Sequence, residues 1–540
     1  MLPYRRYVRE PSPAATDRAA DKERLTGLPY RGNTELGKVE AELRELFSSH
    51  GHVLWGTRHA APCNSWRSER ILLRDETLPR FAYRVHVFQE HAGGYGRYLG
   101  FVSLRPRLSP GRRRPKYRYT SVAHIAPPQF MLRPRYHLVT CMSGPSEGVL
   151  PFRCAPFCAP NVATESAASC LHAALHQALL LKAVSFGFKL ISSQDMITLL
   201  WQKTYETRST YQISREGATL GQALEVLRDP QVGAGGVLES ICLGGFAGPD
   251  LESRKRTVWV ETQRCITDYL ANGLPLIVEI EAAENGEKKK QRDAHVIMVL
   301  GMHLIEDPEE HLLPAQTSPA HGETPEDIAE LPGRFVAHDV AVGPFTELRA
   351  SELMDRAWIA DRAIEGSGIH FLAIAPPGAS MGIYAARRLA RWLAEAENER
   401  FWETYRTELR IPAAPPETED RRRYVTRLLQ TDQIKRRYFS ETSSGQNNQQ
   451  AAEEKFLEPT YKPEQYWWCV EVYIPGWRSE ENPAHDVPPA LVFMWHIEDD
   501  PLLTPTPRAI IRCEGPEKAT LVMPASDTVV RNYGFRIHRP

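Results

Sequence analysis

The sequence predicts an α+β protein in which one buried helix packs on an antiparallel sheet. Residues 164–184, TESAASCLHAALHQALLLKAV, are rich in Ala and Leu, contain no Gly or Pro and begin with capping-type Thr and Ser. Further along, 275–281, 294–305 and 334–342 are short runs rich in Val and Ile, bounded by Gly, Pro or charged turns. Such runs predict neighbouring strands of an antiparallel sheet. The helix and these strands together give the α+β class.

The length of the chain predicts more than one domain. A chain of 540 residues exceeds what one hydrophobic core usually supports. Residues 1–33 are rich in Arg, Pro and Asp without periodicity, and 441–455, ETSSGQNNQQAAEEK, is of low complexity, so both are expected to be disordered. The predicted division is a mobile leader over 1–33, an N-terminal α+β domain over 34–150, the domain with the helix and sheet over 151–380, a charged helical segment over 381–465, and a C-terminal β-rich region over 466–540.

The regions outside the central helix and sheet have periodicities of their own. Leu36, Val39, Leu43 and Leu46 recur at three and four residues, which predicts an amphipathic helix over 35–48. Four tryptophans of the C-terminal region, Trp467, Trp468, Trp477 and Trp495, are expected in its core. The remaining elements that we expect are strands at 81–90 and 97–106, helices at 218–229 and 257–273, and C-terminal strands at 466–476, 490–499, 508–515, 519–524 and 529–538.

Charge and cysteine content exclude some classes of function. The 66 basic and 67 acidic side chains nearly balance, so no global field draws the chain to nucleic acid or to an acidic membrane. The N-terminus lacks an apolar signal region, and no run of about eighteen apolar residues occurs, which favours a cytoplasmic location. The nine cysteines are odd in number and widely spread, as expected for free thiols in a reducing compartment.

Cys170, His295 and Asp339 are the candidate catalytic residues. Cys170 falls near the N-terminus of the predicted helix, where the helix dipole favours a thiolate, and a neighbouring histidine favours it further. Thiol catalysis of acyl transfer also needs a histidine that protonates the leaving group and a third side chain that orients the imidazole. His295 and Asp339 can supply these two roles from adjacent strands.

The order of these residues is that of a known family. A helix-borne Cys is followed by a His that opens a strand, AHVIMVLG, and then by an Asp at the end of the next strand, in FVAHDVAVGP. CLHAAL at 170–175 is similar to the family's Cys-Gly-x-Ala-Ala-Leu helix, GLPLIV at 273–278 to the strand before the histidine, and GATLGQALEVLR at 217–228 to an intermediate helix. Over 160–345 the chain thus resembles the papain-like cysteine peptidases, closest to the bacteriocin-leader-processing, or double-glycine, type. The resemblance implies a papain-like core that hydrolyses a peptide or isopeptide bond through a thioester.

The resemblance also implies an oxyanion site. Members of the family usually carry a glutamine about six residues before the cysteine, whose amide joins the cysteine's backbone N–H in stabilising the oxyanion. Thr164 holds that position here and Glu165 follows, so these two are the candidate oxyanion residues. Leu171 stands where the family has glycine. These departures support a second hypothesis, a catalytically inactive papain-like module that binds a peptide or scaffolds an assembly. A transglutaminase-like acyltransferase, which shares the Cys, His, Asp order, is a third.

No metal or organic cofactor is expected for this chemistry. The expected partner is a protein or peptide substrate, the participation of a regulatory protein is left open, and neither a membrane nor nucleic acid is expected. The flanking regions, about 34–150 and 380–540, double the chain and favour narrow specificity over digestion.

Three other patterns have an ordinary interpretation. His172 and His176 are four residues apart on the predicted helix, where a metal could bind, but no carboxylate or cysteine completes a ligand set. Cys154 and Cys158, with Cys141 upstream, have a loosely finger-like spacing without a second pair, so they are expected to be ordinary thiols. The basic stretch 109–120 is expected to be a solvated loop.

Overall fold

The computed structural model defines the elements that position the candidate site. Several predicted features lie outside the described residues: the leader, the helix at 35–48, the loop at 441–455, Trp477 and the strand at 529–538. The described residues are 53–55, 70–72, 81–91, 94–108, 117–143, 152–159, 168–191, 193–207, 218–281, 294–304, 331–361, 363–394, 423–438, 464–473, 489, 491–503, 507–515 and 518–522.

The chain divides into two compact units, and each is built from segments that are separate in sequence. Unit 1 takes Met1–Ala234, Pro275–His303 and Arg334–Arg356, and unit 2 takes the remainder, Gly235–Leu274, Leu304–Gly333 and Ala357–Pro540. Both contain helices and antiparallel strands, which confirms the α+β class. Among the described residues, no helix combines the length and the apolar character that a membrane crossing requires.

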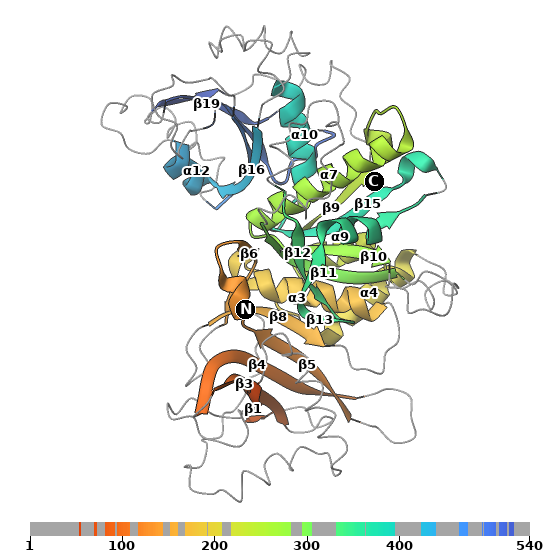
Figure 1. Ribbon diagram of the computed structural model, residues 1–540, viewed down its shortest axis with the longest axis vertical. Coiled ribbons are helices and arrows are strands. Elements are labelled where there is room, and N and C mark those ends of the chain that lie inside the picture. Colours follow the sequence, from red (N-terminus) through yellow and green to blue (C-terminus); the bar gives the residue numbers. More distant parts are fainter. Residues whose placement is uncertain are drawn as a thin grey trace, which may run out of the picture. The chain divides into compact units, whose positions relative to one another are not determined.

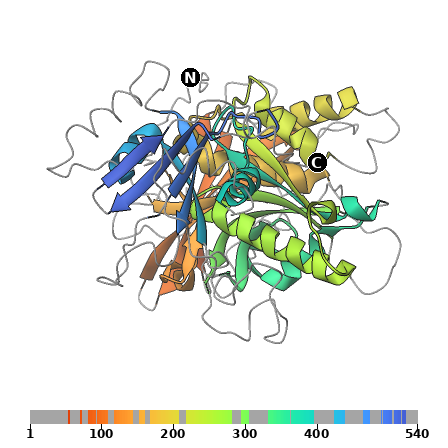
Figure 2. The same ribbon diagram turned by 90° about the horizontal axis from the view of Figure 1, so that it is seen from above.

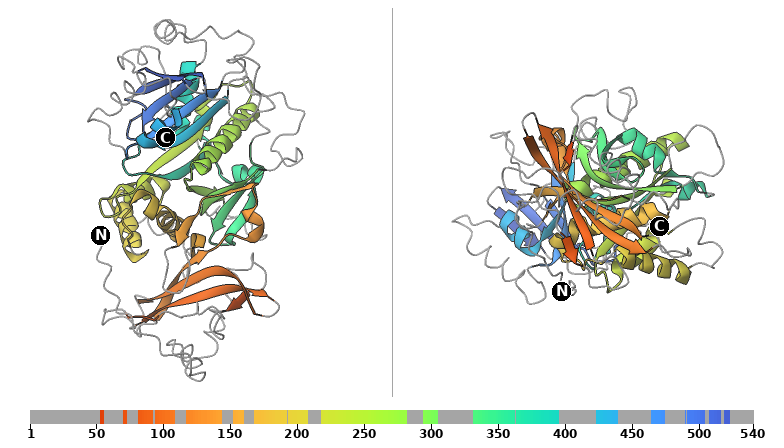
Figure 3. Two further views of the ribbon diagram at one scale, coloured as in Figure 1. Left: turned by 90° about the vertical axis from the view of Figure 1, so that its left-hand side faces the viewer. Right: turned by 90° about the horizontal axis from the view of Figure 1, so that it is seen from below.

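The first sheet of unit 1 is an antiparallel sheet of seven strands. Its order is β1-β3-β4-β5-β8-β7, and β2 pairs with β3. The long central strands lie side by side in Figure 3, at the red and orange end of the colour scale. The strands predicted at 81–90 and 97–106 are present as β3 and β4. The bounds are β1 Val53–Trp55, β2 Arg70–Leu72, β3 Phe81–His91, β4 Gly94–Leu108, β5 Tyr117–Ile125, β7 Cys141–Ser143 and β8 Phe152–Ala159.

The second group of strands in unit 1 carries the predicted antiparallel neighbours. Within it the order is β13-β12-β11-β10, and each successive pair is antiparallel. This confirms the expectation for 275–281, 294–305 and 334–342. The bounds are β10 Leu276–Glu281, β11 Ala294–His303, β12 Arg334–Asp339 and β13 Gly343–Arg349, with helix α9, Ala350–Arg356, after the last strand.

A short strand, β6 (Tyr136–Leu138), also pairs with β11, along Gly301–His303. The two backbones approach so closely that a Cβ at Gly301 would come within 2.7 Å of the His137 carbonyl oxygen, so this position needs glycine. The boundary predicted at 150 falls between β7 and β8, which pair with each other. Residues before 150 therefore contribute a strand, β6, next to the strand that carries His295.

Helix α3 (Ala168–Phe186) is the predicted central helix. It contacts both β8 and β11, as Figure 1 shows, which explains why it is apolar over most of its circumference. Leu175, Ala178 and Leu181 are each no more than 1% exposed. Two further helices of unit 1 are α4, Ser193–Thr207, and α6, Leu220–Arg228. The latter confirms the helix predicted at 218–229, and it begins at a capping box of Thr219 and Gln222.

Unit 2 begins with a pair of antiparallel strands and a long helix. Strand β9 (Gly235–Cys242) pairs along its whole length with β15 (Gly368–Ala375), and β14 (Trp358–Ile359) adds to the other edge of β15. Helix α7 (Leu251–Ala271) confirms the helix predicted at 257–273, but it starts earlier, because the Asp250 carboxylate caps it by accepting a hydrogen bond from the Ser253 N–H.

The C-terminal part of unit 2 is a five-stranded antiparallel sheet in the order β16-β17-β18-β19-β20 (Figure 2). Trp467, Trp468 and Trp495 are at most 1% exposed, which confirms that they belong to its core. The sheet is flanked by α10, Ile383–Ala394, and α12, Thr431–Tyr438. The strands are β16 Arg423–Gln430, β17 Tyr466–Tyr473, β18 Leu491–His496, β19 Ala509–Gly515 and β20 Lys518–Val522.

Strand β16 corrects the prediction that the segment 381–465 is helical outside its loop at 441–455. Residues 423–430, RYVTRLLQ, form an edge strand that pairs with all eight residues of β17. Pairing with the buried strand β17 stabilises 423–430 more than a charged, solvated helix would. Tertiary pairing here overrides the local helix propensity.

The buried carboxylate of Glu471 holds the edge of this sheet, and we expect Glu471→Ala to lower the free energy of unfolding by about 3 kcal/mol. Glu471 is fully buried and accepts hydrogen bonds from Arg427 Nε at 2.8 Å, Arg437 Nε at 2.7 Å and the Tyr438 hydroxyl at 2.6 Å. Removing it leaves two guanidinium groups without their counter-charge. Urea unfolding followed by tryptophan fluorescence measures the change, and Glu464→Ala, at an exposed position just before β17, is the matched control. Equal unfolding midpoints for the two variants would contradict the assignment.

Candidate active site

Cys170 lies in the first turn of α3, as its third described residue. The first turn is where the positive end of the helix dipole lies. The Cys170 side chain is partly exposed, and its neighbour Leu171 is 1% exposed. Leu171 therefore packs into the core, while the Cys170 side chain stays partly exposed.

His295 and Asp339 come from two paired strands. His295 is the second residue of β11 and lies opposite Ile280 of β10. Asp339 is the last residue of β12, and the β11–β12 register pairs Met298 with His338. The next pair along this antiparallel register is Ile297 with Asp339. Since residues two apart on a strand share a face, the side chains of His295 and Asp339 project from the same side of the sheet.

The three predicted side chains form one hydrogen-bonded chain. His295 Nε2 donates to Asp339 Oδ1 at 2.7 Å, and His295 also has a side-chain hydrogen bond with Cys170. Asp339 is 1% exposed and His295 9% exposed, so both are shielded from water while Cys170 remains partly open.

Asp339 is itself held in place by the backbone. Its Oδ1 accepts a hydrogen bond from the Ala341 N–H at 2.8 Å, an Asx turn at the point where β12 ends. This contact was not predicted from the sequence. The signal for it was an aspartate at the end of a predicted strand, where such side chains commonly bond the backbone two residues further on.

The electrostatics of the site favour an imidazolium. Burial lowers the pKa of His295, but the hydrogen bonds to Asp339 and Cys170 and the negative charges of these groups outweigh it and raise the pKa to about 9. Burial raises the pKa of Asp339, but the hydrogen bond and positive charge of His295 hold it below its usual range. An imidazolium between a carboxylate and a thiolate is the charge state that nucleophilic attack by sulfur requires.

We therefore expect the imidazole of His295 to titrate with an apparent pKa of about 9. The raised pKa means that the imidazolium is present at neutral pH and is lost only as the pH rises through this value. NMR of the histidine ring C–H signals, compared with His295→Gln to assign the resonance, measures the midpoint. Buried His338, whose pKa burial lowers to about 3, provides an internal contrast that stays neutral over the same range. A His295 midpoint near the ordinary value of about 6.5 would contradict the ion pair.

A second pair of a thiol and an imidazole, Cys158 and His176, is also in contact, but its surroundings differ from those of Cys170 and His295. Cys158 Sγ is 3.4 Å from His176 Nδ1, and burial raises the pKa of Cys158 to about 12. Both side chains are buried. Cys158 is therefore a suitable reference for Cys170, because it also contacts a histidine but is buried and lies on a strand instead of a helix.

The helix histidines show no metal arrangement. The rings of His172 and His176 lie nearly parallel with centroids 6.2 Å apart. Over the described part of the chain, no group of three His, Cys, Asp or Glu side chains is arranged to hold a metal ion. Thr164 and Glu165, the candidate oxyanion residues, lie outside the described residues.

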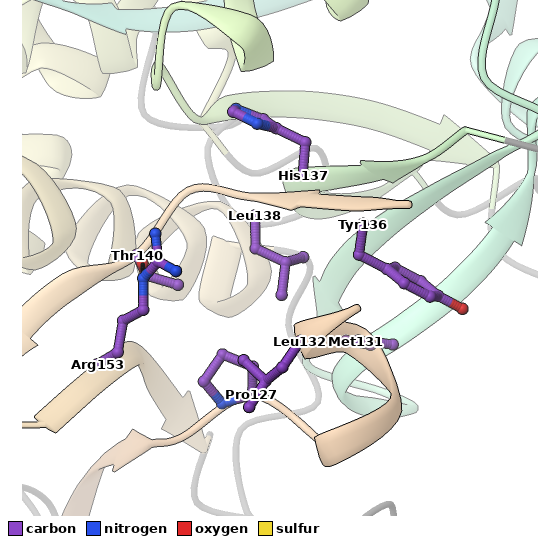
Figure 4. A pocket seen from close by; sticks show the side chains of 8 residues that line it. All are labelled: Pro127, Met131, Leu132, Tyr136, His137, Leu138, Thr140 and Arg153. Atoms are coloured by element: carbon purple, nitrogen blue, oxygen red, sulfur yellow. Dashed lines mark hydrogen bonds between the residues drawn. The ribbon is translucent and has the colours of Figure 1, made fainter. Parts of the chain in front are cut away.

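A pocket of about 110 Å³ lies in unit 1, away from the three candidate residues (Figure 4). Its lining includes Met131 and Leu132 from the short helix η2 (Gln129–Leu132), Tyr136 and Leu138 from β6, and Arg153 from β8. β6 pairs with the end of β11 opposite to His295, so this pocket is not the cleft of the candidate site.

Neither the protein-family models nor the curated proteins that we compared with the chain gave a match.

Proposed function

We propose that the chain is a papain-like cysteine peptidase that hydrolyses a peptide or isopeptide bond of a protein or peptide substrate. The observation that supports it best is the hydrogen-bonded series Cys170, His295 and Asp339, in which the carboxylate bonds His295 Nε2 and the Cys170 side chain also bonds the same imidazole. This is the arrangement in which one histidine can serve both as partner of a thiolate and as proton donor to a leaving group.

In the proposed mechanism, Cys170 Sγ attacks the scissile carbonyl carbon, and the electron pair of the carbonyl moves onto oxygen. When the tetrahedral intermediate collapses, the His295 imidazolium donates its proton to the leaving amine, and a thioester on Cys170 remains. Neutral His295 then takes a proton from water, which attacks the thioester and releases the acid. Asp339 keeps the imidazole in the required tautomer and orientation throughout.

Oxyanion stabilisation in this proposal comes from the backbone N–H of Cys170 and a donor near Thr164. The hydroxyl of Thr164 can donate, whereas an ionised Glu165 would repel the developing charge. No metal or organic cofactor takes part in these steps. The proposal places the protein in the cytoplasm, where its thiols stay reduced.

Two alternatives make different predictions for the same residues. An inactive papain-like module is supported by the absence of the family's glutamine before the cysteine. A transglutaminase-like acyltransferase would use the same thioester but pass the acyl group to an amine instead of water. Which acceptor reaches the thioester decides between hydrolysis and transfer.

A synthetic peptide library, screened by mass spectrometry with and without a small primary amine, separates the three functions. A peptidase gives cleavage products whose new C-terminus is a free acid, and an acyltransferase gives products that carry the amine. Cys170→Ala should abolish either product, while Cys158→Ala should retain it. If the wild-type chain forms neither product, and hydroxylamine traps no acyl group from it, the peptidase proposal fails and the binding module remains.

A further inference from the structure

Cys141 and Cys154 face each other across two paired strands. The β7–β8 register places them directly opposite, and their sulfur atoms are 3.9 Å apart, with both thiols free. Residues directly opposite in an antiparallel pair have Cα atoms about 4.5 to 5.5 Å apart. That separation lies within the range that a disulfide spans. Closing the bond therefore needs only a rotation of the side chains, without movement of the strands.

The two thiols are not equivalent. Cys141 is partly exposed, whereas Cys154 is fully buried. The hydrogen bond from Cys154 lowers the pKa of Cys141, burial opposes this, and the ammonium of Lys182 on α3 lowers it further. The same hydrogen bond, together with burial, raises the pKa of Cys154. An accessible thiolate next to a buried thiol is the arrangement found in redox-active cysteine pairs, in which one attacks and the other resolves.

We propose that Cys141 and Cys154 are a reversible dithiol site for oxidation by a small peroxide, with Cys141 as the attacking thiolate and Cys154 as the resolving thiol. The Cys141 thiolate attacks one peroxide oxygen and breaks the O–O bond, which gives a sulfenic acid and one hydroxide ion. The Cys154 thiol then displaces the hydroxyl group of the sulfenic acid, which leaves as water. In total two thiols and one hydrogen peroxide give one disulfide and two waters.

The other described thiols lack at least one part of this arrangement. Cys158, Cys265 and Cys469 are buried, and burial raises the pKa of each. On the paired strands, Val122 lies opposite Cys158 and Met494 opposite Cys469. Cys242 is partly exposed, but burial raises its pKa as well, and Gly368 lies opposite it. Cys170 is the proposed nucleophile of the peptidase, so its replacement by Ala keeps the two chemistries apart. The dithiol site does not depend on the proposed peptidase activity.

The test uses the full-length Cys170→Ala chain with one equivalent of hydrogen peroxide at neutral pH, followed by alkylation of the remaining thiols. Trypsin releases 136–153, which carries Cys141, and 154–182, which carries both Cys154 and Cys158. We expect these fragments to be joined by a bond between Cys141 and Cys154, located by fragmentation and reversed by dithiothreitol. In Cys154→Ser, the reaction should stop at a Cys141 sulfenic acid that dimedone captures.

Lys182→Met should slow the oxidation of Cys141 by several-fold, up to about tenfold, since each unit of pKa changes the thiolate fraction by that factor. Lys203→Met is the matched control, because it removes a lysine from another helix, α4. The proposal is overturned if Cys141 is oxidised no faster than buried Cys265, or if the joined partner of Cys141 is Cys158.

Discussion

Cys170→Ala is expected to lower peptide-bond turnover by about 10⁴-fold or more, because no other group in the site can form the thioester. The histidine and aspartate remain in the variant, but without the thiol there is no nucleophile for the histidine to assist. Turnover is measured on the peptide that the library screen identifies, with purified variants whose folding is checked by circular dichroism.

Cys158→Ala is the matched control for this prediction, since it removes a thiol that also contacts a histidine. Its loss should leave turnover within a few-fold of wild type. If the two variants are equally active, or if Cys158→Ala is the inactive one, the assignment of the nucleophile is wrong.

Asp339→Ala is expected to lower turnover by about 10³-fold, since His295 loses the group that fixes its tautomer and orientation. The free imidazole could then rotate or present the wrong nitrogen to the thiol. Asp339→Asn separates orientation from charge, because its amide oxygen can still accept the hydrogen bonds of His295 Nε2 and the Ala341 N–H. We expect Asn to cost only about tenfold in turnover and to move the His295 titration midpoint downward from about 9, since the carboxylate charge that raises this pKa is gone.

Equal losses for Asp339→Ala and Asp339→Asn would mean that the negative charge, and not the orientation, is what His295 needs. An unchanged titration midpoint in both variants would contradict the coupling of Asp339 to His295 altogether.

The local patterns predicted the elements that carry the candidate site. Residues 164–184 lack Gly and Pro and are dominated by Ala and Leu, and from Ala168 on they lie in α3, which ends at Phe186; 164–167 are outside the described residues. The runs rich in Val and Ile at β10, β11 and β12 form adjacent antiparallel strands as expected. These elements could be predicted from the sequence because propensity and burial agree within each short segment.

Long-range pairing accounts for most of what the sequence did not predict. β6 joins β11 across more than 160 residues of chain, and β9 pairs with β15 although neither strand was predicted. β16 looked helical because its charged neighbours outnumber its apolar residues, and only its partner β17 makes it a strand. The contact of Cys141 with Cys154 likewise depends on a register that spacing alone does not determine.

The most direct test of the catalytic chain is the rate at which iodoacetamide labels Cys170 from about pH 5 to about pH 9, in wild type and in His295→Ala, with Cys158 as the reference thiol. The ion pair predicts that Cys170 is labelled well below the ordinary thiol pKa, faster than Cys158, and that this acidic reactivity disappears in His295→Ala. If Cys170 is labelled no faster than Cys158, with the same pH dependence in both chains, the hydrogen-bonded series does not activate the thiol and the peptidase proposal is contradicted.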